Sequence, residues 1–206
     1  MLSIPEVQPP PVDPRVRRSR AALFAAVIDL VSRGESANVT TAAIAEAAAL
    51  SRQVIYQQFG DRDTLVVEAA LDLLRHDVLP QIADRPALAP RERALVTARH
   101  FAAHRRFYRP VLTSSCASAF SRGLAELHLP PNRALVDQIL GDDRDPQTAE
   151  DLAVYLTGGG IAFLTEWVVN GADPLDCEQF VDRLAHLHAA LDRSEKLSAR
   201  DEGQPQ

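Results

Sequence analysis

Apolar residues recur along most of this chain at intervals of three and four positions, the spacing that places them on one face of a helix. Residues 14–33 show the pattern first, with a stripe of alanine and aliphatic residues that ends directly before Gly34, a residue typical of helix ends. Alternating runs of branched and aromatic residues, which would indicate strands, are nearly absent. The pattern therefore predicts an all-α protein.

Three helices are expected directly after the first. Thr40 and Thr41 can cap a short helix that ends near residue 48, and Ser51 can cap another that ends near residue 59. Asp61 can cap a longer helix over 62–79, which Pro80 would stop. Two short helices joined by a tight turn and packed on a longer first helix form a helix-turn-helix.

Further helices are expected over about 90–105, 106–114, 117–140, 147–170 and 175–192, which gives about nine in total. Pro130-Pro131 should break or bend the helix over 117–140. The three glycines 158–160 lie within the helix over 147–170. They leave three alternatives, which are a helix break, the close approach of a second helix, and a ligand lying against bare backbone.

Four segments follow from this organisation. Residues 1–14 contain five prolines and are expected to form a disordered arm. Residues 15–62 form the predicted helix-turn-helix domain, and residues 63–193 form a larger helical domain. Residues 194–206 are polar and are expected to be a flexible tail.

Charge separates the first domain from the remainder of the chain. The 206 residues together carry a formal charge of −6. Residues 15–62 hold seven arginines against four acidic residues, whereas residues 63–206 carry a net charge of −7. This asymmetry favours a basic binding head on an acidic body.

Several classes of protein are disfavoured. No unbroken apolar run reaches the ~18 residues that a membrane span needs, and the N-terminus does not fit a secretory signal, so we expect a cytoplasmic protein with no membrane partner. The chain has no HExxH, no GxSxG and no phosphate-binding glycine loop, so we expect no enzyme activity and no cofactor. Cys116 and Cys177 have no CxxC spacing and are expected to be inert thiols.

The second short helix carries the candidate DNA-reading residues, in the stretch ALSRQVIYQQFGDR over 49–62. Ser51, Arg52 and Gln53 stand at its start, where a recognition helix contacts base edges. Arg can read guanine and Gln can read adenine through paired hydrogen bonds. Tyr56, one turn further, can reach a phosphate with its hydroxyl.

The run TTAAIAEAAALSRQVIYQQFGDRDTL over 40–65 resembles the DNA-binding signature of the TetR family of regulators. The matching positions are Thr41, Ile44, Ala45, Ala48, Leu50, Ser51, Tyr56, Phe59, Arg62 and Leu65. Ala49 stands where the family has a turn glycine, and Arg62 stands where it has a lysine. The resemblance covers about the first 75 residues at motif level. It implies a three-helix DNA-binding domain followed by a helical ligand-binding and dimerisation domain.

The resemblance also implies residue roles. Thr41 would cap the second helix and contact phosphate, and Arg62 would contact phosphate from the following helix. Arg17 and Arg18 would touch the DNA backbone or minor groove, or else form a solvated charge run. The full set expected to contact DNA is Arg17, Arg18, Thr40, Thr41, Ser51, Arg52, Gln53, Tyr56, Gln57, Gln58 and Arg62.

The resemblance further implies a pocket in the body for an unknown small apolar or amphipathic effector. The candidate lining residues, each of which could instead be core, are His100, Phe101, His104, Tyr108, Phe120, Tyr155, Phe163 and Trp167. His100 and His104 have the i, i+4 spacing of metal ligands, but no third ligand is near them in sequence, so we expect no metal.

A dimer of the last two helices is the remaining implication, as a four-helix bundle. The expected interface residues are Gly159, Phe163, Phe180, Leu184, Leu187 and Leu191. Together these features predict a DNA-binding transcriptional regulator, a repressor that binds a palindromic double-stranded DNA operator as a homodimer and is released by its effector. The alternative is a helical ligand-binding module without DNA binding.

Overall fold

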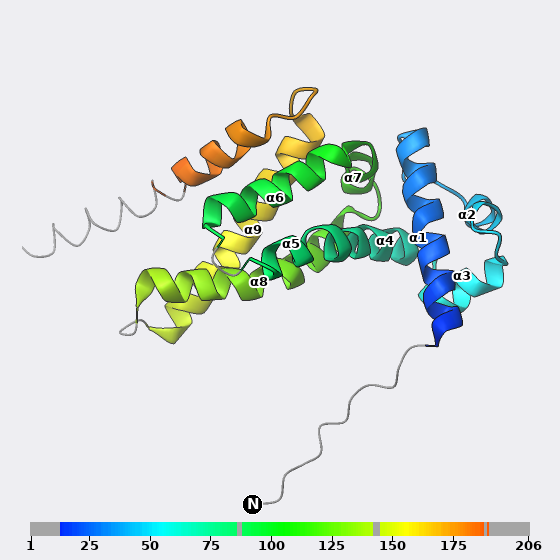
Figure 1. Ribbon diagram of the computed structural model, residues 1–206, viewed down its shortest axis with the longest axis horizontal. Helices are drawn as coiled ribbons and strands as arrows, with labels where there is room; N and C mark the ends of the chain where they lie inside the picture. Colours follow the sequence, from blue (N-terminus) through cyan, green and yellow to red (C-terminus); the bar gives the residue numbers. More distant parts are fainter. Residues whose placement is uncertain (1–12, 86–87, 142–144, 188, 190–206) are drawn as a thin grey trace, which may run out of the picture.

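The computed structural model describes residues 13–85, 88–141, 145–187 and 189, and every regular element within these ranges is helical. A three-helix head lies at one end of the molecule, and the remaining helices form a body beside it (Figure 1). The helices are α1 (Pro14–Gly34), α2 (Thr41–Ala47), α3 (Arg52–Phe59), α4 (Arg62–Asp77), α5 (Leu79–Ala83), α6 (Pro90–Ala103), α7 (Arg105–Leu112), α8 (Ala117–Leu140) and α9 (Pro146–Asn170). A last helical segment begins at residue 177. The all-α prediction is confirmed.

Polar side chains set the starts of the head helices. The Thr40 hydroxyl accepts a hydrogen bond from the Ala43 amide at 3.1 Å, so Thr40 caps α2, and the expectation that Thr41 is the cap is wrong. Asp61 caps α4 by accepting from the Thr64 amide at 2.7 Å, as the sequence predicts. Ser51 occupies the cap position of α3, but its side chain makes no capping hydrogen bond.

The head is held together by side chains that are removed from solvent. Leu23 and Val27 of α1, Ile44 of α2 and Ile55 of α3 are fully buried and belong to one core cluster. The Phe59 ring joins this cluster at the end of α3, with its centroid 5.6 Å from that of Phe24. Burial of this apolar surface fixes the angle between α2 and α3, because neither short helix is stable by itself.

Helix α4 connects the head to the body, and the core is continuous along it. Its buried residues include Leu65, Val66 and Ala69 toward the head and Leu71 and Leu74 toward the body. It ends at Asp77 rather than at the expected residue 79, and Pro80 lies in the first turn of α5, where a missing amide hydrogen costs nothing.

Helix α8 crosses α4 closely at Gly123. A Cβ atom at this position would lie 2.4 Å from the Cδ1 atom of Leu71, which is far inside van der Waals contact. Gly123 therefore lets the two helices approach where no other residue fits without displacement of Leu71.

Two features expected to interrupt helices do not do so. α8 continues through Pro130 and Pro131 to Leu140, and α9 continues through the glycines at 158–160 to Asn170. The helix-break alternative for the glycines is therefore wrong. The Arg105 side chain closes the end of α9, donating to the carbonyls of Val168, Gly171 and Ala172.

Helix α9 is also apolar on its outside. By length and composition alone, it is long and apolar enough to cross a membrane, and it is the one such helix among the described residues. Its best 18-residue window has a mean hydropathy of 1.5. Only 28% of that window is buried within the chain. The expectation of no membrane partner was based on the absence of a long unbroken apolar run, whereas this window is interrupted by polar residues. A single such helix is weak evidence for a membrane span.

Candidate nucleic-acid interface

The two sides of α3 differ sharply in exposure. Arg52, Gln53, Tyr56 and Gln57 are all exposed, and Tyr56 has 54% of its surface accessible. Ile55 and Phe59 face inward and are buried. The polar side chains therefore form one outward face, which we call the reading face, and Arg52 forms no ion pair with any described residue.

Gln58 does not belong to the reading face. Its side chain is only partly accessible, and its Oε1 atom is buried without a hydrogen-bond partner among the described residues. The expectation that Gln58 reaches DNA is therefore not met by this geometry, because the side chain faces the packed side of α3.

The turn between α2 and α3 places Ala49 in the left-handed region, with φ of 54°. The Ala49 amide donates to the Glu46 carbonyl at 3.0 Å, and the Leu50 amide donates to the Ala45 carbonyl at 2.9 Å. These two bonds form a Schellman motif, which usually has glycine at the left-handed position. The turn therefore keeps the backbone shape that glycine would give, and Ala49 carries the strain of its Cβ atom.

The other residues expected to contact DNA lie at the edges of the head. Arg17 and Arg18 are exposed on the first turns of α1, and Thr40, Thr41 and Ser51 lie at the starts of α2 and α3. Arg62 differs, because its guanidinium donates to Asn38 at 2.8 Å and pairs with Asp63. A phosphate contact from Arg62 would have to compete with these partners.

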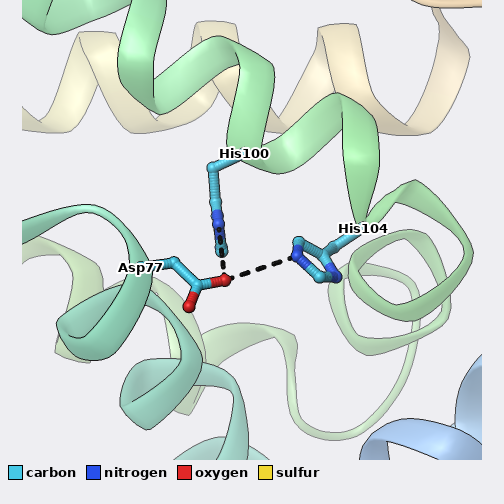
Figure 2. Close-up of side chains that lie close together, drawn as sticks. All are labelled: Asp77, His100 and His104. Carbon is cyan, nitrogen blue, oxygen red and sulfur yellow. Dashed lines mark ion pairs between the residues drawn. The ribbon is translucent and has the colours of Figure 1, made fainter. Parts of the chain in front are cut away.

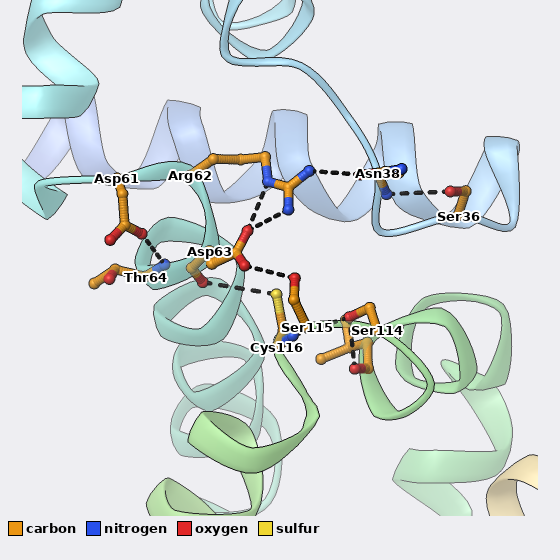
Figure 3. Close-up of polar contacts among 10 residues, drawn as sticks. Ser36, Asn38, Asp61, Arg62, Asp63, Thr64, Ser114, Ser115 and Cys116 are labelled. Atoms are coloured by element: carbon orange, nitrogen blue, oxygen red, sulfur yellow. Dashed lines mark hydrogen bonds and ion pairs between the residues drawn. The ribbon is translucent and has the colours of Figure 1, made fainter.

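Asp63 joins the head to the body (Figure 3). Its carboxylate accepts from Arg62 on one side and from the Ser115 hydroxyl, before α8, at 2.6 Å on the other. The hydrogen bond from Ser115, followed by that from Arg62, lowers the pKa of the Asp63 carboxyl. A cleft of about 420 Å³ opens beside this junction, lined by Glu35, Ser36, Ala37, Asn38, Arg62, Pro110, Thr113, Ser114 and Ser115.

The expected effector pocket is filled by its own lining. Phe101, Tyr108 and Phe120 are fully buried, and the Tyr108 ring lies 4.4 Å from Phe101 and 5.7 Å from Phe120 between centroids. Phe163 and Trp167 lie elsewhere, where both stack on Phe180. These aromatic residues therefore form core, and the interpretation of them as one open pocket is not supported by their packing.

Tyr155 is placed on the outside of α9, with 64% of its surface accessible, so it does not join the other candidate pocket residues. Val154, Gly158 and Gly159 are exposed on the same helix, and Leu187 is half exposed on the last segment. A Cβ atom built on Gly158, Gly159 or Gly160 meets nothing within 4 Å in this chain. We call this outward surface of α9 the small-residue face.

The remaining expected interface residues differ in position. Phe180 is buried against Phe163 and Trp167 within the chain, so it is not available to a partner. Leu184 is partly accessible, and Leu191 lies outside the described residues. Cys116 is buried and Cys177 is partly buried, both are free, and burial raises the pKa of each thiol, which lowers the fraction of reactive thiolate.

Asp77 brings a third ligand-type side chain to the two histidines (Figure 2). Its Oδ2 atom lies 3.5 Å from Nδ1 of His100 and 3.5 Å from Nε2 of His104. Burial, with a smaller contribution from His104, lowers the pKa of His100 to about 4. Asp77 was not predicted from the sequence, because it lies on α4 and nothing in the pattern predicts that this helix end packs beside α6.

A three-helix head with an exposed polar face on its third helix defines a helix-turn-helix domain. Residues 28–69 match the family model described as bacterial regulatory proteins, tetR family, which supports a DNA-binding head and a role in transcription regulation. The resemblance found in the sequence is thereby confirmed.

A similar protein of known structure supports the same fold for most of the chain. A solved structure described as dihydroxyacetone kinase operon activator DhaS is 15% identical, with a TM-score of 0.54, and the match covers 84% of this chain and 95% of that one. At this identity the likeness carries the fold alone. No curated protein matches.

Proposed function

We propose that this regulator binds a palindromic operator as a homodimer and that the reading face of α3 enters the major groove. The observation that carries the proposal is the exposure of Arg52, Gln53, Tyr56 and Gln57 together, on a helix whose other side is buried in the head. These residue types are those that hydrogen-bond to base edges and phosphates.

Individual roles follow from position along α3. Arg52 and Gln53 lie at its start, where they face base edges, and the Tyr56 hydroxyl binds a backbone phosphate. Thr40, Thr41 and Ser51 surround the same helix starts and are proposed phosphate contacts, as are Arg17 and Arg18 of α1. Arg62 is proposed to orient α4 through its hydrogen bonds to Asn38 and Asp63, and a contact with phosphate is secondary to that role.

The small-residue face of α9 supports the proposed dimer. Val154 and Tyr155 are exposed beside glycines that leave the helix backbone uncovered. Each glycine inside a helix costs about 1 kcal/mol relative to alanine, and close approach of a second helix offsets that cost. A dimer through this face also places two heads on one duplex, with half-sites about 34–36 Å apart or at multiples of that spacing.

Regulation is proposed to be a population shift. The operator binds one arrangement of the two heads, and an effector that favours another arrangement releases the DNA by linkage. Repression by occupancy of the operator is the proposed outcome, in the cytoplasm. The similar structure is described as an activator, and that description applies to that protein and not to this chain.

The alternative, a helical ligand-binding module without DNA binding, predicts no salt-dependent association with duplex DNA. Selection of bound duplexes from a random pool separates the two, because it gives the operator sequence and the half-site spacing together. Phosphate contacts make the logarithm of affinity fall linearly with the logarithm of salt concentration. Failure to enrich any sequence, together with binding that does not change with salt, would refute the proposal.

The decisive variant is Arg52→Ala. It should cost about 1–3 kcal/mol and relax specificity at one base position, whereas Tyr56→Phe should weaken binding evenly across sequences. Arg109→Ala is the matched control, because Arg109 is an exposed arginine of α7 in the body. Equal operator affinity for Arg52→Ala and Arg109→Ala would refute the base-reading role.

A further inference from the structure

Three ligand-type side chains converge from two helices at the boundary between α4 and α6. Asp77 is the last residue of α4, and His100 and His104 lie on one side of α6 and at its end. Figure 2 shows the Asp77 carboxylate pointing into the space between the two rings. Their ligand atoms all lie within 4.8 Å of one another.

The distances fit a coordination shell better than a hydrogen-bonded cluster. The carboxylate oxygen Oδ2 is 3.5 Å from each of the two ring nitrogens. Charge-assisted hydrogen bonds between such atoms are about 2.7–2.9 Å long. Ligands bound to one tetrahedral Zn²⁺ at about 2.1 Å are instead separated by about 3.4 Å. Two edges of such a tetrahedron are therefore already present, and the nitrogens of the two histidines must approach each other to complete the third.

Tyr108 orients His100 for this role. The Tyr108 hydroxyl donates its one hydrogen to the Ala70 carbonyl, 3.2 Å away, so it accepts a hydrogen bond from Nε2 of His100 at 2.8 Å. The neutral ring then carries its hydrogen on Nε2, and the lone pair of Nδ1 points toward Asp77. Metal-binding histidines are commonly held in this way, with the second nitrogen donating to a fixed polar group.

Burial separates the roles of the three ligands. His100 is buried, whereas the side chains of Asp77 and His104 remain partly accessible, at 42% and 34%. An ion can therefore enter from solvent, bind against a fixed imidazole and draw in His104. Water can occupy the remaining coordination position.

We propose that Asp77, His100 and His104 bind one divalent transition-metal ion, with Zn²⁺ as the best match to two imidazole nitrogens and one carboxylate. This donor set suits Zn²⁺, Co²⁺ and Ni²⁺ over Mg²⁺ and Ca²⁺, which prefer oxygen ligands. The bound ion joins the far end of α4 to α6.

The test is calorimetric titration of the full chain, freed of metal by a chelator, with ZnCl₂, and with CoCl₂ followed by visible absorption. We expect one ion per chain and the intense absorption of tetrahedral Co²⁺. Affinity should fall at least tenfold in Asp77→Asn and in His104→Ala, and about tenfold in Tyr108→Phe, which removes only the orienting hydroxyl. His104→Ala changes a partly exposed side chain, and its circular dichroism should match the parent.

His76→Ala is the matched control, because His76 and Asp72 form an exposed histidine–carboxylate pair one residue away that has two ligands instead of three. The His76→Ala variant should bind Zn²⁺ with the same affinity as the parent. Absence of Zn²⁺ binding by the parent, or equal loss in His76→Ala and His104→Ala, would overturn the site and leave an ion-pair cluster only.

A consequence for regulation rests on the proposed function, since α4 carries the head. Zn²⁺ should change operator affinity in the parent and in His76→Ala but not in His104→Ala. An equal change of operator affinity in the parent and both variants would overturn this coupling. The calorimetric titration would still show whether the metal site exists. If no operator is bound with or without metal, the proposed function fails separately from the metal site.

Discussion

Replacement of Ala49 by glycine should stabilise the protein, against the general rule that glycine weakens helical regions. Ala49 has φ of 54° and lies in the turn between α2 and α3. Its side chain is exposed, so removal of the methyl group creates no cavity. The backbone bonds of the turn, from the amides of Ala49 and Leu50, remain unchanged by the substitution.

The expected magnitude is the difference between two effects. An L-residue other than glycine in the left-handed region costs roughly 1–2 kcal/mol, because Cβ approaches the following carbonyl oxygen. Glycine gives the unfolded chain more freedom, which costs roughly 0.4–1 kcal/mol on folding. Ala49→Gly should therefore raise the free energy of unfolding by about 0.5–1 kcal/mol, which for a chain of this length raises Tm by about 1–4 °C.

The assay is urea denaturation followed by circular dichroism, together with a thermal scan. Ala48→Gly is the matched control, because Ala48 is the neighbouring alanine and has φ of −82° in the right-handed region. It should lower stability by about 0.5–1 kcal/mol. If Ala49→Gly lowers stability as much as Ala48→Gly does, the strain assigned to the turn does not exist.

Three further outcomes are expected. Gly159→Ala should raise the stability of an isolated protomer by up to about 1 kcal/mol, because the added Cβ atom meets nothing within the chain. The same Cβ atom would face a partner helix, so the proposed dimer should weaken at least ~10-fold in sedimentation equilibrium. An unweakened dimer contradicts the interface. Gly123→Ala should lose at most about 1–2 kcal/mol in urea denaturation, because the crowding of Leu71 outweighs the better helix propensity of alanine. The same substitution should cost less in a Leu71→Ala background, where the crowded side chain is absent, although Leu71→Ala is itself destabilising. Additive losses contradict the contact. Ser115→Ala should lose about 0.5–1 kcal/mol at neutral pH. Since the folded pKa of Asp63 lies below 3.8, this contribution is complete above that value and disappears as pH falls through the folded pKa, so the difference from the parent should shrink only in acid.

Local chemistry made the head predictable from sequence. The stripe over 14–33, the cap at Asp61 and the burial of Ile55 and Phe59 all depend on neighbours within one or two turns. Thr40 and Thr41 are adjacent and chemically equal as caps, so only the backbone decides that Thr40 has the extended conformation a cap requires. Gln58 was misplaced because α3 is short, and one position changes which side of it a residue occupies.

The body was less predictable, because its chemistry depends on contacts between distant helices. Aromatic residues at helical spacing fit a pocket or a core equally well, and only the packing of the Tyr108 ring against Phe101 and Phe120 decides for core. Asp77 looks like an ordinary acidic residue near a helix end until the end of α4 is placed next to His100 and His104. The outward position of Tyr155 likewise follows from how α9 packs on α8.

Helix α8 crowds α4 where Gly123 lies against Leu71. From Leu71 the helix runs six residues to Asp77 and nine residues to Arg62, which at 1.5 Å per residue are arms of roughly 9 Å and 13 Å. If α4 turned as a rigid body about this point, its two ends would move in opposite directions, and the head end would move about 1.5 times as far as the end at Asp77. A displacement of about 1 Å at Asp77, beside His100 and His104, would then move the head end of α4 about 1.5 Å in the opposite direction.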